Sequence, residues 1–382
     1  MIQLDEDQLE AVERCVWDAR DQVLTGGAGT GKTTIIKAIA DRLEGSVVMC
    51  PTGKAAARVR QATGHDAFTI HRYLRWDGGT FRRSPAFEPL ECPVIIDESS
   101  MIDSWLMARL VEFRPTKLIL VGDDAQLPPV GAGQPFHDLI ALCPEMVIRL
   151  NHCYRAAGAV HKASNAIRRG DAPPRSERAA GESFKILEIG GVSRTIEKIE
   201  GWVKKGFLDP TQDAILAPRY GDGESDAGID RINAAVKAIV NPSDEPFAAG
   251  DRVLCNKNFA AIDLWNGDTG TITAINKNHM SIKLDRTQGD YVTQVTKEQR
   301  KEITHAYCLS VHKAQGSQFR NVFVVVQERD WHMLSRSLLY TAVTRAQKGV
   351  CVIGEVKAFY KGIGRVNKKT TVMQVLCEGS ET

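Results

Sequence analysis

The chain has 382 residues, of which 43% are hydrophobic and 25% are charged, and its formal net charge at pH 7 is +2. This length favours two or more domains, and the composition is ordinary for a soluble globular protein. The small net charge excludes a globally basic nucleic-acid-binding protein, so a nucleic-acid site, if present, must be a local groove.

The cysteines and the apolar runs limit the environment of the chain. None of the nine cysteines lies in a CxxC pair, and most lie in apolar runs. We therefore expect buried, reduced thiols in a cytosolic protein rather than a disulfide framework or a zinc site. There is no signal peptide and no apolar run of about 18 residues, so we expect no membrane insertion.

The first predicted element is an amphipathic helix over residues 5–19. Leu9, Val12, Cys15 and Val16 lie at helical spacing, and we expect them to share one face. Acidic residues at the start of this segment suit the positive end of a helix dipole.

A glycine-rich loop over residues 26–33, with the sequence GGAGTGKT, organises the chain. It matches the pattern GxxxxGK[ST] at every fixed position, between an apolar strand and an amphipathic helix, and this context argues against a glycine turn with a chance lysine. Glycines let the backbone wrap around a polyphosphate, and a helix N-terminus attracts anions. Lys32 is expected to reach the β- and γ-phosphates of ATP, and the Thr33 hydroxyl to hold Mg²⁺. The expected nucleotide contacts in this stretch are Gly27, Ala28, Gly29, Thr30, Gly31, Lys32, Thr33 and Thr34.

A further strand and helix predict a parallel α/β sheet. Residues 46–50 form an apolar strand, residues 55–61 a helix, and residues 69–74 a short helix. Residues 75–91 then contain paired glycines, two prolines and two phenylalanines. This stretch fits a protruding hairpin or a plain surface loop, and taken alone we interpret it as a loop.

Two strand ends carry polar groups that suit nucleotide hydrolysis. An apolar strand ends in Asp97 and Glu98, the arrangement by which an NTPase presents one acid to Mg²⁺ and a second acid to the attacking water. A strand at 117–121 leads into a loop made rigid by prolines that contains Gln126, which either senses a γ-phosphate or is an incidental polar residue of a turn. Residues 146–150 are expected to form the last strand of the first domain.

The second half of the chain combines α/β patterns with a β-rich insertion. Residues 249–304 contain short strand-like runs separated by Gly, Asn and Asp, which predicts a small barrel inserted into a second α/β domain. Its basic and aromatic residues are a weak nucleic-acid signal, and an ordinary barrel core with a solvated face explains them equally well. The other predicted elements are strands at 184–187, 214–217, 321–326 and 349–354, helices at 229–240 and 335–345, a polar turn or helix start at 310–318, and a surface connection at 168–181.

In order, these segments resemble the motifs of superfamily 1 helicases, specifically the group B branch of RecD-like and Dda-like 5′-to-3′ DNA helicases. The resemblance covers nearly the whole chain. The loop GDDAQLPPV together with TIH favours group B, because the group A branch usually reads GDxxQSIYxFRGA at this point. The matching segments are GGAGTGKTT (motif I), PTGKAA (Ia), TIHRYL (Ib), VIIDESSMID (II), GDDAQLPPVGAG (III), LNHCYRA (IV), SVHKAQGSQF (V) and YTAVTRA (VI).

The resemblance implies roles in nucleotide hydrolysis. Gln8 is similar to the glutamine that contacts adenine, and Tyr154 to the aromatic residue that stacks on adenine. Arg155 and Arg345 resemble two arginine fingers that reach the γ-phosphate from the second domain, which would make hydrolysis depend on domain closure. Gln126 would couple the γ-phosphate to the DNA site. The implied catalytic set is Lys32, Asp97, Glu98, Gln126, Arg155 and Arg345, with Thr33 and Asp97 at the metal and Gln315 and Gly316 near the nucleotide.

The same resemblance implies a DNA path across both α/β domains. Hydroxyl, imidazole and ammonium groups would contact the phosphates of a single strand. In this position residues 75–91 resemble the pin, a hairpin that splits the duplex, and an aromatic residue in it could stack on the last base pair. The candidate DNA contacts are Pro51, Thr52, Lys54, Thr69, His71, Phe81, Phe87, Asn258 and His312.

The implied fold has two RecA-like parallel-sheet P-loop domains, with a small hairpin insertion in the first and an SH3-like β-barrel insertion in the second. The expected domains are 1–74 and 92–150 (domain 1A), 75–91 (1B), 151–248 and 305–382 (2A), and 249–304 (2B). The chain lacks the long N-terminal extension of full RecD-type proteins, so we do not expect assembly into a RecBCD-like nuclease. The insertion is also short for the tower of Dda-like enzymes.

We therefore expect a monomeric, cytoplasmic DNA helicase that uses ATP and Mg²⁺, from a bacterial cell or a phage-infected host. Its partners would be single-stranded DNA, single-strand/duplex junctions and replication or recombination proteins such as a single-strand binding protein. Two alternatives stay open: a DNA or RNA translocase that remodels nucleoprotein with little unwinding, and a nucleic-acid-binding regulator switched by ATP. The full hydrolytic set argues against a pure switch, and the motifs do not distinguish replication, recombination and repair.

Overall fold

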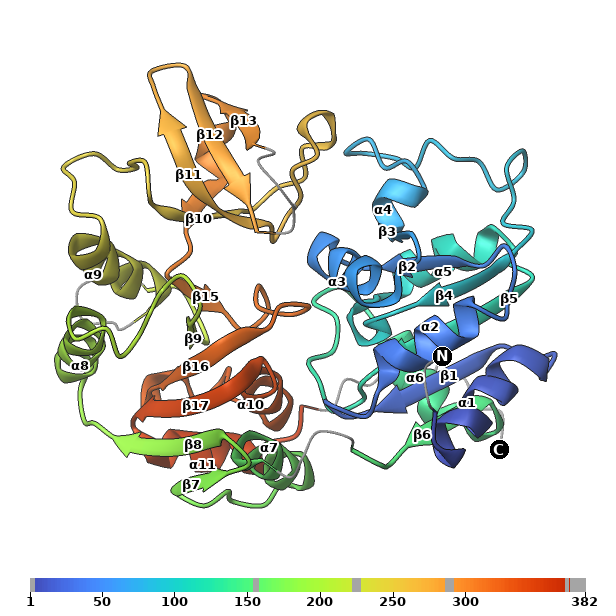
Figure 1. Cartoon of the computed structure of the whole chain (residues 1–382), viewed down its shortest axis with the longest axis horizontal. Coiled ribbons are helices and arrows are strands. Elements are labelled where there is room, and N and C mark those ends of the chain that lie inside the picture. Colours follow the sequence, from blue (N-terminus) through green and yellow to red (C-terminus); the bar gives the residue numbers. More distant parts are fainter. Residues whose placement is uncertain (1–3, 154–157, 222–227, 286–291, 368–370, 372–382) are drawn as a thin grey trace. The chain divides into compact units, whose positions relative to one another are not determined.

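The computed structural model describes residues 4–153, 158–221, 228–285, 292–367 and 371. The chain divides into two compact units, the first comprising residues 1–156 and 368–382 and the second residues 157–367 (Figure 1). Among the described residues, none of the helices combines the length and the apolar character needed to cross a membrane.

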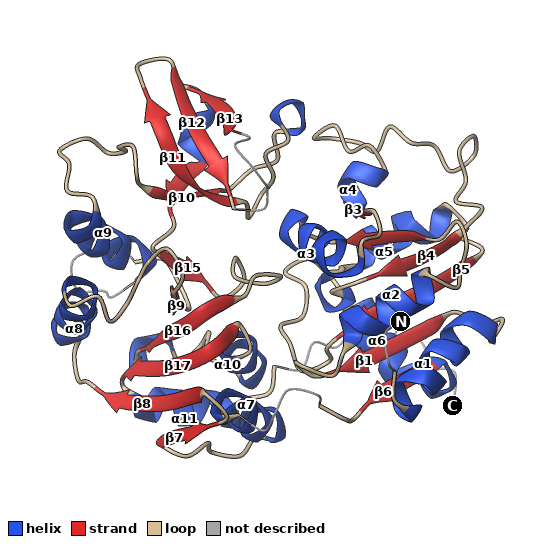
Figure 2. Ribbon diagram, viewed as in Figure 1, coloured by secondary structure: helices blue, strands red, loops and turns tan. Residues whose placement is uncertain are grey.

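The first unit is built on a six-stranded parallel sheet with the strand order β3-β2-β4-β5-β1-β6. Helices cover both faces of this sheet (Figure 2), which confirms the parallel α/β prediction. The strands are β1 (Gln22–Gly26), β2 (Val47–Cys50), β3 (Ala67–Thr69), β4 (Pro93–Ile96), β5 (Lys117–Gly122) and β6 (Val147–Leu150). The helices are α1 (Glu6–Trp17), α2 (Lys32–Ala40), α3 (Gly53–Thr63), α4 (Ile70–Tyr73), α5 (Ser104–Glu112) and α6 (Pro135–Leu142).

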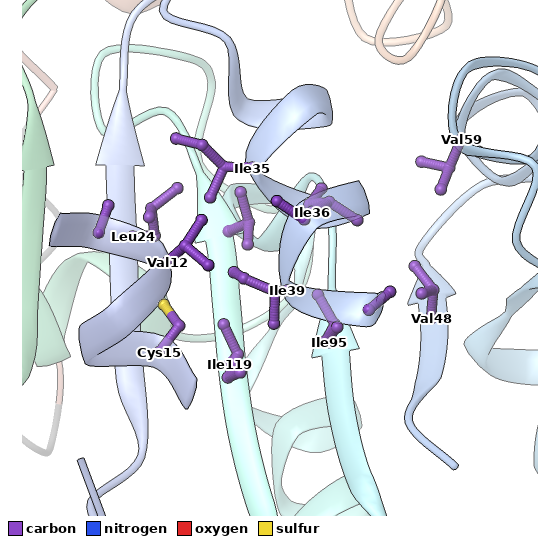
Figure 3. Close-up of a cluster of buried hydrophobic side chains, with 14 of the residues drawn as sticks. Val12, Cys15, Leu24, Ile35, Ile36, Ile39, Val48, Val59, Ile95 and Ile119 are labelled. Carbon is purple, nitrogen blue, oxygen red and sulfur yellow. The ribbon is translucent and has the colours of Figure 1, made fainter. Parts of the chain in front are cut away.

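Alternate residues of the strands supply two hydrophobic clusters on opposite faces of this sheet. Leu24, Ile95 and Ile119 pack with α1, α2 and α3 in one cluster, which Figure 3 shows. Val23 and Val94 belong to the other cluster, with residues of α5 and α6. The sheet therefore lies in the middle of the unit, and its strand ends are left to carry polar groups.

Helix α1 starts one residue later than predicted and buries a different face. Asp5 caps it, and Gln8 completes a capping box. The buried residues are Gln8, Ala11, Val12 and Cys15, whereas Leu9 is 40% exposed. The prediction that Leu9 shares the buried face is therefore wrong. Successive residues lie about 100° apart around a helix, and it is the side chain of Gln8 that lies on the buried face with Val12 and Cys15.

The second unit contains a six-stranded sheet with the order β15-β9-β16-β17-β8-β7. Its neighbours pair in parallel, except that β7 runs antiparallel to β8. The strands are β7 (Ser176–Ala179), β8 (Glu182–Glu188), β9 (Ala214–Ala217), β15 (Cys308–Ser310), β16 (Phe319–Val326) and β17 (Ala346–Gly354). The helices are α7 (Ala159–Arg169), α8 (Val192–Lys204), α9 (Ile229–Val240), α10 (Arg336–Val343) and α11 (Val356–Gly364). The expected surface connection at 168–181 thus contains an edge strand, and residues 311–316 form turns after β15.

A five-stranded antiparallel sheet with the order β13-β12-β11-β10-β14 also belongs to the second unit. Its strands are β10 (Arg252–Cys255), β11 (Thr269–Ile275), β12 (His279–Leu284), β13 (Val292–Thr296) and β14 (Ile303–His305), around a separate hydrophobic cluster. Since β14 pairs with β10, the chain leaves this sheet beside the point where it enters. The SH3-like classification and the proposed domain limits stay predictions.

Candidate nucleotide and DNA sites

Three neighbouring strands of the first unit bring the predicted nucleotide residues to one edge. Strand β5 pairs in parallel with both β1 and β4, so the carboxyl ends of the three strands meet at the same edge. The glycine-rich loop follows β1, the Asp97–Glu98 pair follows β4, and Gln126 lies in the loop after β5. This edge is where open parallel sheets bind ligands.

The glycine-rich loop has a backbone that only small residues allow. Gly29 and Gly31 have positive φ angles of 85° and 79°, in the left-handed region. A Cβ atom on Gly26 would lie 2.6 Å from Thr30 Oγ1. Helix α2 starts directly after the loop without a side-chain cap, so its first N–H groups suit an anion.

Lys32 folds back over the loop that precedes it. Its Nζ donates to the carbonyl oxygens of Gly26 and Gly27 at 2.6 and 2.9 Å. Thr33 and Thr34 follow in the first turn of α2 and are half-buried. The ammonium group is therefore held over the concave side of the loop, where a polyphosphate would exchange for the two carbonyl oxygens.

Asp97 and Glu98 are both buried, being 1% and 4% exposed. Glu98 has a φ of 55°, an uncommon backbone conformation for a non-glycine residue that often marks functional sites. Its N–H donates to Asp97 Oδ1 at 2.9 Å, while Asp97 Oδ2 accepts no hydrogen bond from the described residues. Burial raises the pKa of Asp97, and the charge of Glu98 raises it further, whereas the nearby Arg58 lowers it.

This donor set fits Mg²⁺. A buried carboxylate oxygen without a hydrogen-bond donor follows β4, and a threonine hydroxyl follows the phosphate loop at the same edge of the sheet. Together they offer the hard oxygen ligands that Mg²⁺ prefers. A divalent cation would also relieve the repulsion that raises the pKa of Asp97.

Gln126 is 4% exposed and only partly satisfied. Its Nε2 donates to Asp123 Oδ2 at 3.4 Å, and its Oε1 has no hydrogen-bond partner among the described residues. Asp124, two residues earlier in the same loop, donates its N–H to Thr25 Oγ1 near the end of β1, at 3.3 Å. This loop is thus joined to the strand that carries the phosphate loop.

The predicted adenine contacts are placed only in part. Gln8 Oε1 accepts a hydrogen bond from the N–H of Asp5 at 3.4 Å and so caps α1. Tyr154 and Arg155 lie outside the described residues. Cys153, the last described residue before them, donates from Sγ to the carbonyl oxygen of Ala28 at 3.5 Å.

In the second unit, Arg345 and the loop of residues 315–317 form one cluster. Arg345 is 4% exposed, and its guanidinium donates to the carbonyl oxygens of Thr341 at 3.1 Å and Ser317 at 3.5 Å. Gln315 is 6% exposed, and its Nε2 has no partner among the described residues. Gly316 has a φ of 73°, which turns the chain between them. An arginine, a buried amide and a tight turn are therefore held together within this unit.

The DNA candidates of the first unit lie beside the nucleotide edge. Pro51, Thr52 and Lys54 follow β2, and Thr69 ends the neighbouring parallel strand β3. The hydroxyls of Thr52 and Thr69 cap α3 and α4, accepting backbone N–H bonds at 3.3 and 3.1 Å. A threonine hydroxyl that accepts one hydrogen bond can also donate its hydrogen to a phosphate oxygen.

The aromatic candidates differ in exposure. Burial lowers the pKa of His71, whose ring lies 5.8 Å from that of Phe81. Phe81 is half-buried against the hydrophobic core, whereas Phe87 is 88% exposed. Only Phe87 of the two phenylalanines therefore presents a whole ring to solvent.

Asn258 and His312 belong to the second unit. Asn258 Oδ1 accepts from the N–H of Asn266 at 2.8 Å, and Asn266 Oδ1 accepts from Lys313 Nζ. Burial lowers the pKa of His312, next to this lysine. The turn after β15 is thus joined to the loop between β10 and β11.

Comparison with known proteins decides the family. Residues 3–191 match the model described as an AAA domain, and residues 305–353 match the UvrD-like helicase C-terminal domain. The chain is 31% identical over 403 residues to the RecBCD enzyme subunit RecD of Mycolicibacterium smegmatis, covering 88% of this chain and 69% of the relative. It belongs to the RecD-like helicases of superfamily 1 group B.

One further relative agrees with this assignment, and two solved structures share the fold. The RecD-like chain is 32% identical over 375 residues to the ATP-dependent RecD2 DNA helicase of Deinococcus radiodurans, covering 93% of this chain but only 50% of the relative. Its fold resembles the Pif1 helicase of Candida albicans, with a TM-score of 0.58, 19% identity and complete coverage of both chains. A Bacteroides Pif1 structure in complex with ADP-AlF3 and ssDNA gives a TM-score of 0.54 at 18% identity, covering 100% of this chain and 97% of that one.

Two residues of this RecD-like chain were missed by the sequence analysis. Arg58 on α3 lies beside the Asp97–Glu98 pair, and Trp105 on α5 contacts the rings of Trp76 and Phe81. The sequence around Arg58 shows only an arginine on a helix of small residues, and that around Trp105 only a tryptophan at a helix start. Neither pattern predicts which side chains these residues contact. Both contacts join segments that are distant in the sequence.

Proposed function

We propose that the chain is an ATP-driven DNA helicase that moves 5′ to 3′ along single-stranded DNA and unwinds duplexes. The observation that carries this proposal is the meeting of the phosphate loop, the Asp97–Glu98 pair and Gln126 at one edge of the sheet. The complete set of helicase motifs and the relatives named as DNA helicases support it.

Hydrolysis would use the buried groups of this edge. Lys32 leaves the two loop carbonyl oxygens and binds the β- and γ-phosphates. Glu98 orients the attacking water and accepts its proton. Mg²⁺, held by Thr33 and Asp97, would neutralise charge on the phosphates. Arg345, together with Arg155, stabilises the transferring phosphoryl group.

Gln126 would report the state of the γ-phosphate. Its Oε1 lacks a partner among the described residues, so it can accept a hydrogen bond from the attacking water. The same loop continues to residue 133, and a change in its position would reach residues beyond the nucleotide edge.

DNA would be held by the residues after β2 and β3, and by His312 and Asn258 in the second unit. Burial lowers the pKa of both His71 and His312, so these side chains would bind phosphates as neutral hydrogen-bond donors. We assign residues 75–91 as the pin and residues 249–304 as the SH3-like insertion. The substrates would be single strands and single-strand/duplex junctions.

Strand displacement tests the proposal. Two partial duplexes, one with a 5′ single-stranded tail and one with a 3′ tail, are incubated with ATP and Mg²⁺, with Lys32→Ala as the inactive control. Opening of only the 5′-tailed duplex is expected. Opening of only the 3′-tailed duplex would overturn the polarity, and ATPase stimulated by single strands without opening of either duplex would indicate a translocase.

A further inference from the structure

Three aromatic rings from two separate segments of the first unit form one cluster. Phe81 stacks on Trp105, with ring centroids 5.4 Å apart and an interplanar angle of 24°. Trp76 lies 4.8 Å from Phe81 and 5.7 Å from Trp105, the latter edge to face. Trp76 and Phe81 are also joined by an antiparallel backbone bridge. Trp105 lies in the first turn of α5, so the cluster ties residues 75–91 to this helix.

The start of α5 is packed from another side by the loop that follows Gln126. The N–H of Ser104 donates to the carbonyl oxygen of Ala132 at 2.9 Å. A side chain on Gly131 would overlap the carboxylate of Asp103, which caps α5. A side chain on Gly133 would overlap the Ser104 hydroxyl. Loop 127–133 and the aromatic cluster therefore contact neighbouring residues of the same helix end.

Contacts outside the aromatic cluster fix another part of segment 75–91, residues 83–90. The guanidinium of Arg83 lies 4.9 Å from the centre of the Tyr73 ring, and its Nε donates to the carbonyl oxygen of Glu88 at 3.1 Å. Leu90 is buried and donates its N–H to Phe113 at 2.8 Å. These contacts fix residues 83–90 of the segment, whereas Trp105 fixes the part around Phe81.

We propose that Trp105 is a positioning residue for the pin: together with Trp76 and Phe81 it fixes segment 75–91 to the end of α5 against which loop 127–133 is packed. This proposal rests on the helicase function proposed above. It assigns Phe81 to the support of the pin and leaves the exposed Phe87 to meet the duplex. A change in the loop after Gln126 would then reach the pin through α5.

The test compares Trp105→Ala with Trp105→Phe on a 5′-tailed duplex. We expect Trp105→Ala to slow unwinding about threefold to tenfold, because an aromatic pair contributes modestly to a partly exposed cluster. ATPase stimulated by single-stranded DNA and translocation without a duplex should stay within about twofold of wild type. The number of base pairs opened per ATP should therefore fall, and Trp105→Phe should restore most of it. Trp17→Ala, which removes another tryptophan that is 80% exposed, should behave as wild type.

A double variant separates positioning from a general loss of stability. Phe81→Ala combined with Trp105→Ala should be no slower than the slower single variant, because both remove the same support. Additive losses, or wild-type unwinding by Trp105→Ala, would overturn the proposal. If Trp105→Ala fails to fold, Phe81→Ala carries the same comparison, and wild-type unwinding by it would overturn the proposal. A wild-type chain that opens no duplex would instead contradict the helicase function itself.

Discussion

Arg58 lies on α3, the helix that follows β2, and its Nη2 is 3.3 Å from Glu98 Oε1. The same nitrogen is 3.6 Å from Asp97 Oδ2. One guanidinium thus pairs with both carboxylates and offsets part of their charge. Burial alone would lower the pKa of Arg58, but the charges of Glu98 and Asp97 outweigh it and raise this pKa above its ordinary value. This contact lowers the free-energy cost of burying two neighbouring carboxylates.

Arg58→Ala should destabilise the chain by about 3 kcal/mol, because the buried carboxylates lose their counter-charge. Mg²⁺ alone should then raise the melting temperature more in this variant than in wild type, since the cation replaces the missing charge. Thermal unfolding with and without MgCl₂ measures both effects. Arg60→Ala is the matched control, because Arg60 lies on the same helix but donates to Ala67. Equal Mg²⁺ shifts in all three proteins would contradict this role.

Lys32→Ala should lower ATP hydrolysis about 100-fold or more, because the phosphates lose their main positive contact. Lys37→Ala, on the outer side of the same helix, removes only an exposed pair with Asp41 at 3.1 Å and should hydrolyse ATP normally. Steady-state ATPase rates with single-stranded DNA test the pair of variants. Near-normal turnover by Lys32→Ala would refute the nucleotide site.

The sequence was sufficient to predict the strands that build the nucleotide edge. Short apolar runs bounded by glycine, proline and carboxylates gave β1, β2, β4, β5 and β6 within about two residues. The phosphate loop has a fixed spacing, so Lys32 and Thr33 followed from local pattern. The family of the chain, predicted from the order of its motifs, is confirmed.

Several helices were not predicted, because their apolar stripes are short or interrupted. Helix α7 buries mostly small residues, among them three alanines and a serine, and α8 and α11 contain glycine. Their stability comes from packing on the sheet rather than from helix propensity. Antiparallel pairing of β7 with β8 depends on a tight turn at Ala180 and Gly181, both with positive φ angles.

The site was predicted where chemistry is local and missed where it depends on tertiary contact. Asp97 and Glu98 were predicted from a strand end. Arg58 and Trp105 were missed because their partners are distant in the sequence, about 40 residues from Arg58 and at least 24 from Trp105. Local residue spacing does not predict contacts over such separations. The roles of Gln126 and Arg345 stay predictions.

Arg345→Ala should slow hydrolysis by about 1000-fold or more while nucleotide binding stays near wild type, because its charge acts on the transition state. Binding of a fluorescent nucleotide and single-turnover hydrolysis separate the two effects. Lys348→Ala is the control, since Lys348 is exposed three residues further on. A loss of binding with unchanged hydrolysis at saturation would contradict an arginine finger.

The stability of the chain should fall on acidification, in part through His137. Burial lowers the pKa of this side chain below its ordinary value of 6.5, and its Nε2 faces the carbonyl oxygen of Asp124 at 3.2 Å. Below pH 6.5 His137 is protonated in the unfolded chain before it is protonated in the folded chain. Its contribution to the free energy of unfolding is therefore fully present above pH 6.5 and is lost as the pH falls through the pKa of the folded state. Melting temperatures from pH 8 to 5 should fall less steeply in His137→Asn than in wild type. His332→Asn, at an exposed histidine, should follow wild type, and parallel curves for all three proteins would exclude His137 as the cause.

Phe87→Ala should slow duplex unwinding about fivefold or more, because stacking of an aromatic ring on a base contributes about 1–3 kcal/mol. Phe87 is 88% exposed on a turn in which the N–H groups of Phe87 and Glu88 both donate to the carbonyl oxygen of Ser84, so its removal should cost little stability. Strand displacement on a 5′-tailed duplex and ATPase on single strands are compared, with Val111→Ala as an exposed apolar control on α5. Unwinding should fall in Phe87→Ala alone while its ATPase stays near wild type. Unchanged unwinding would mean that residues 84–88 form an ordinary surface turn, and the strand-separating contact would have to be sought elsewhere in the first unit.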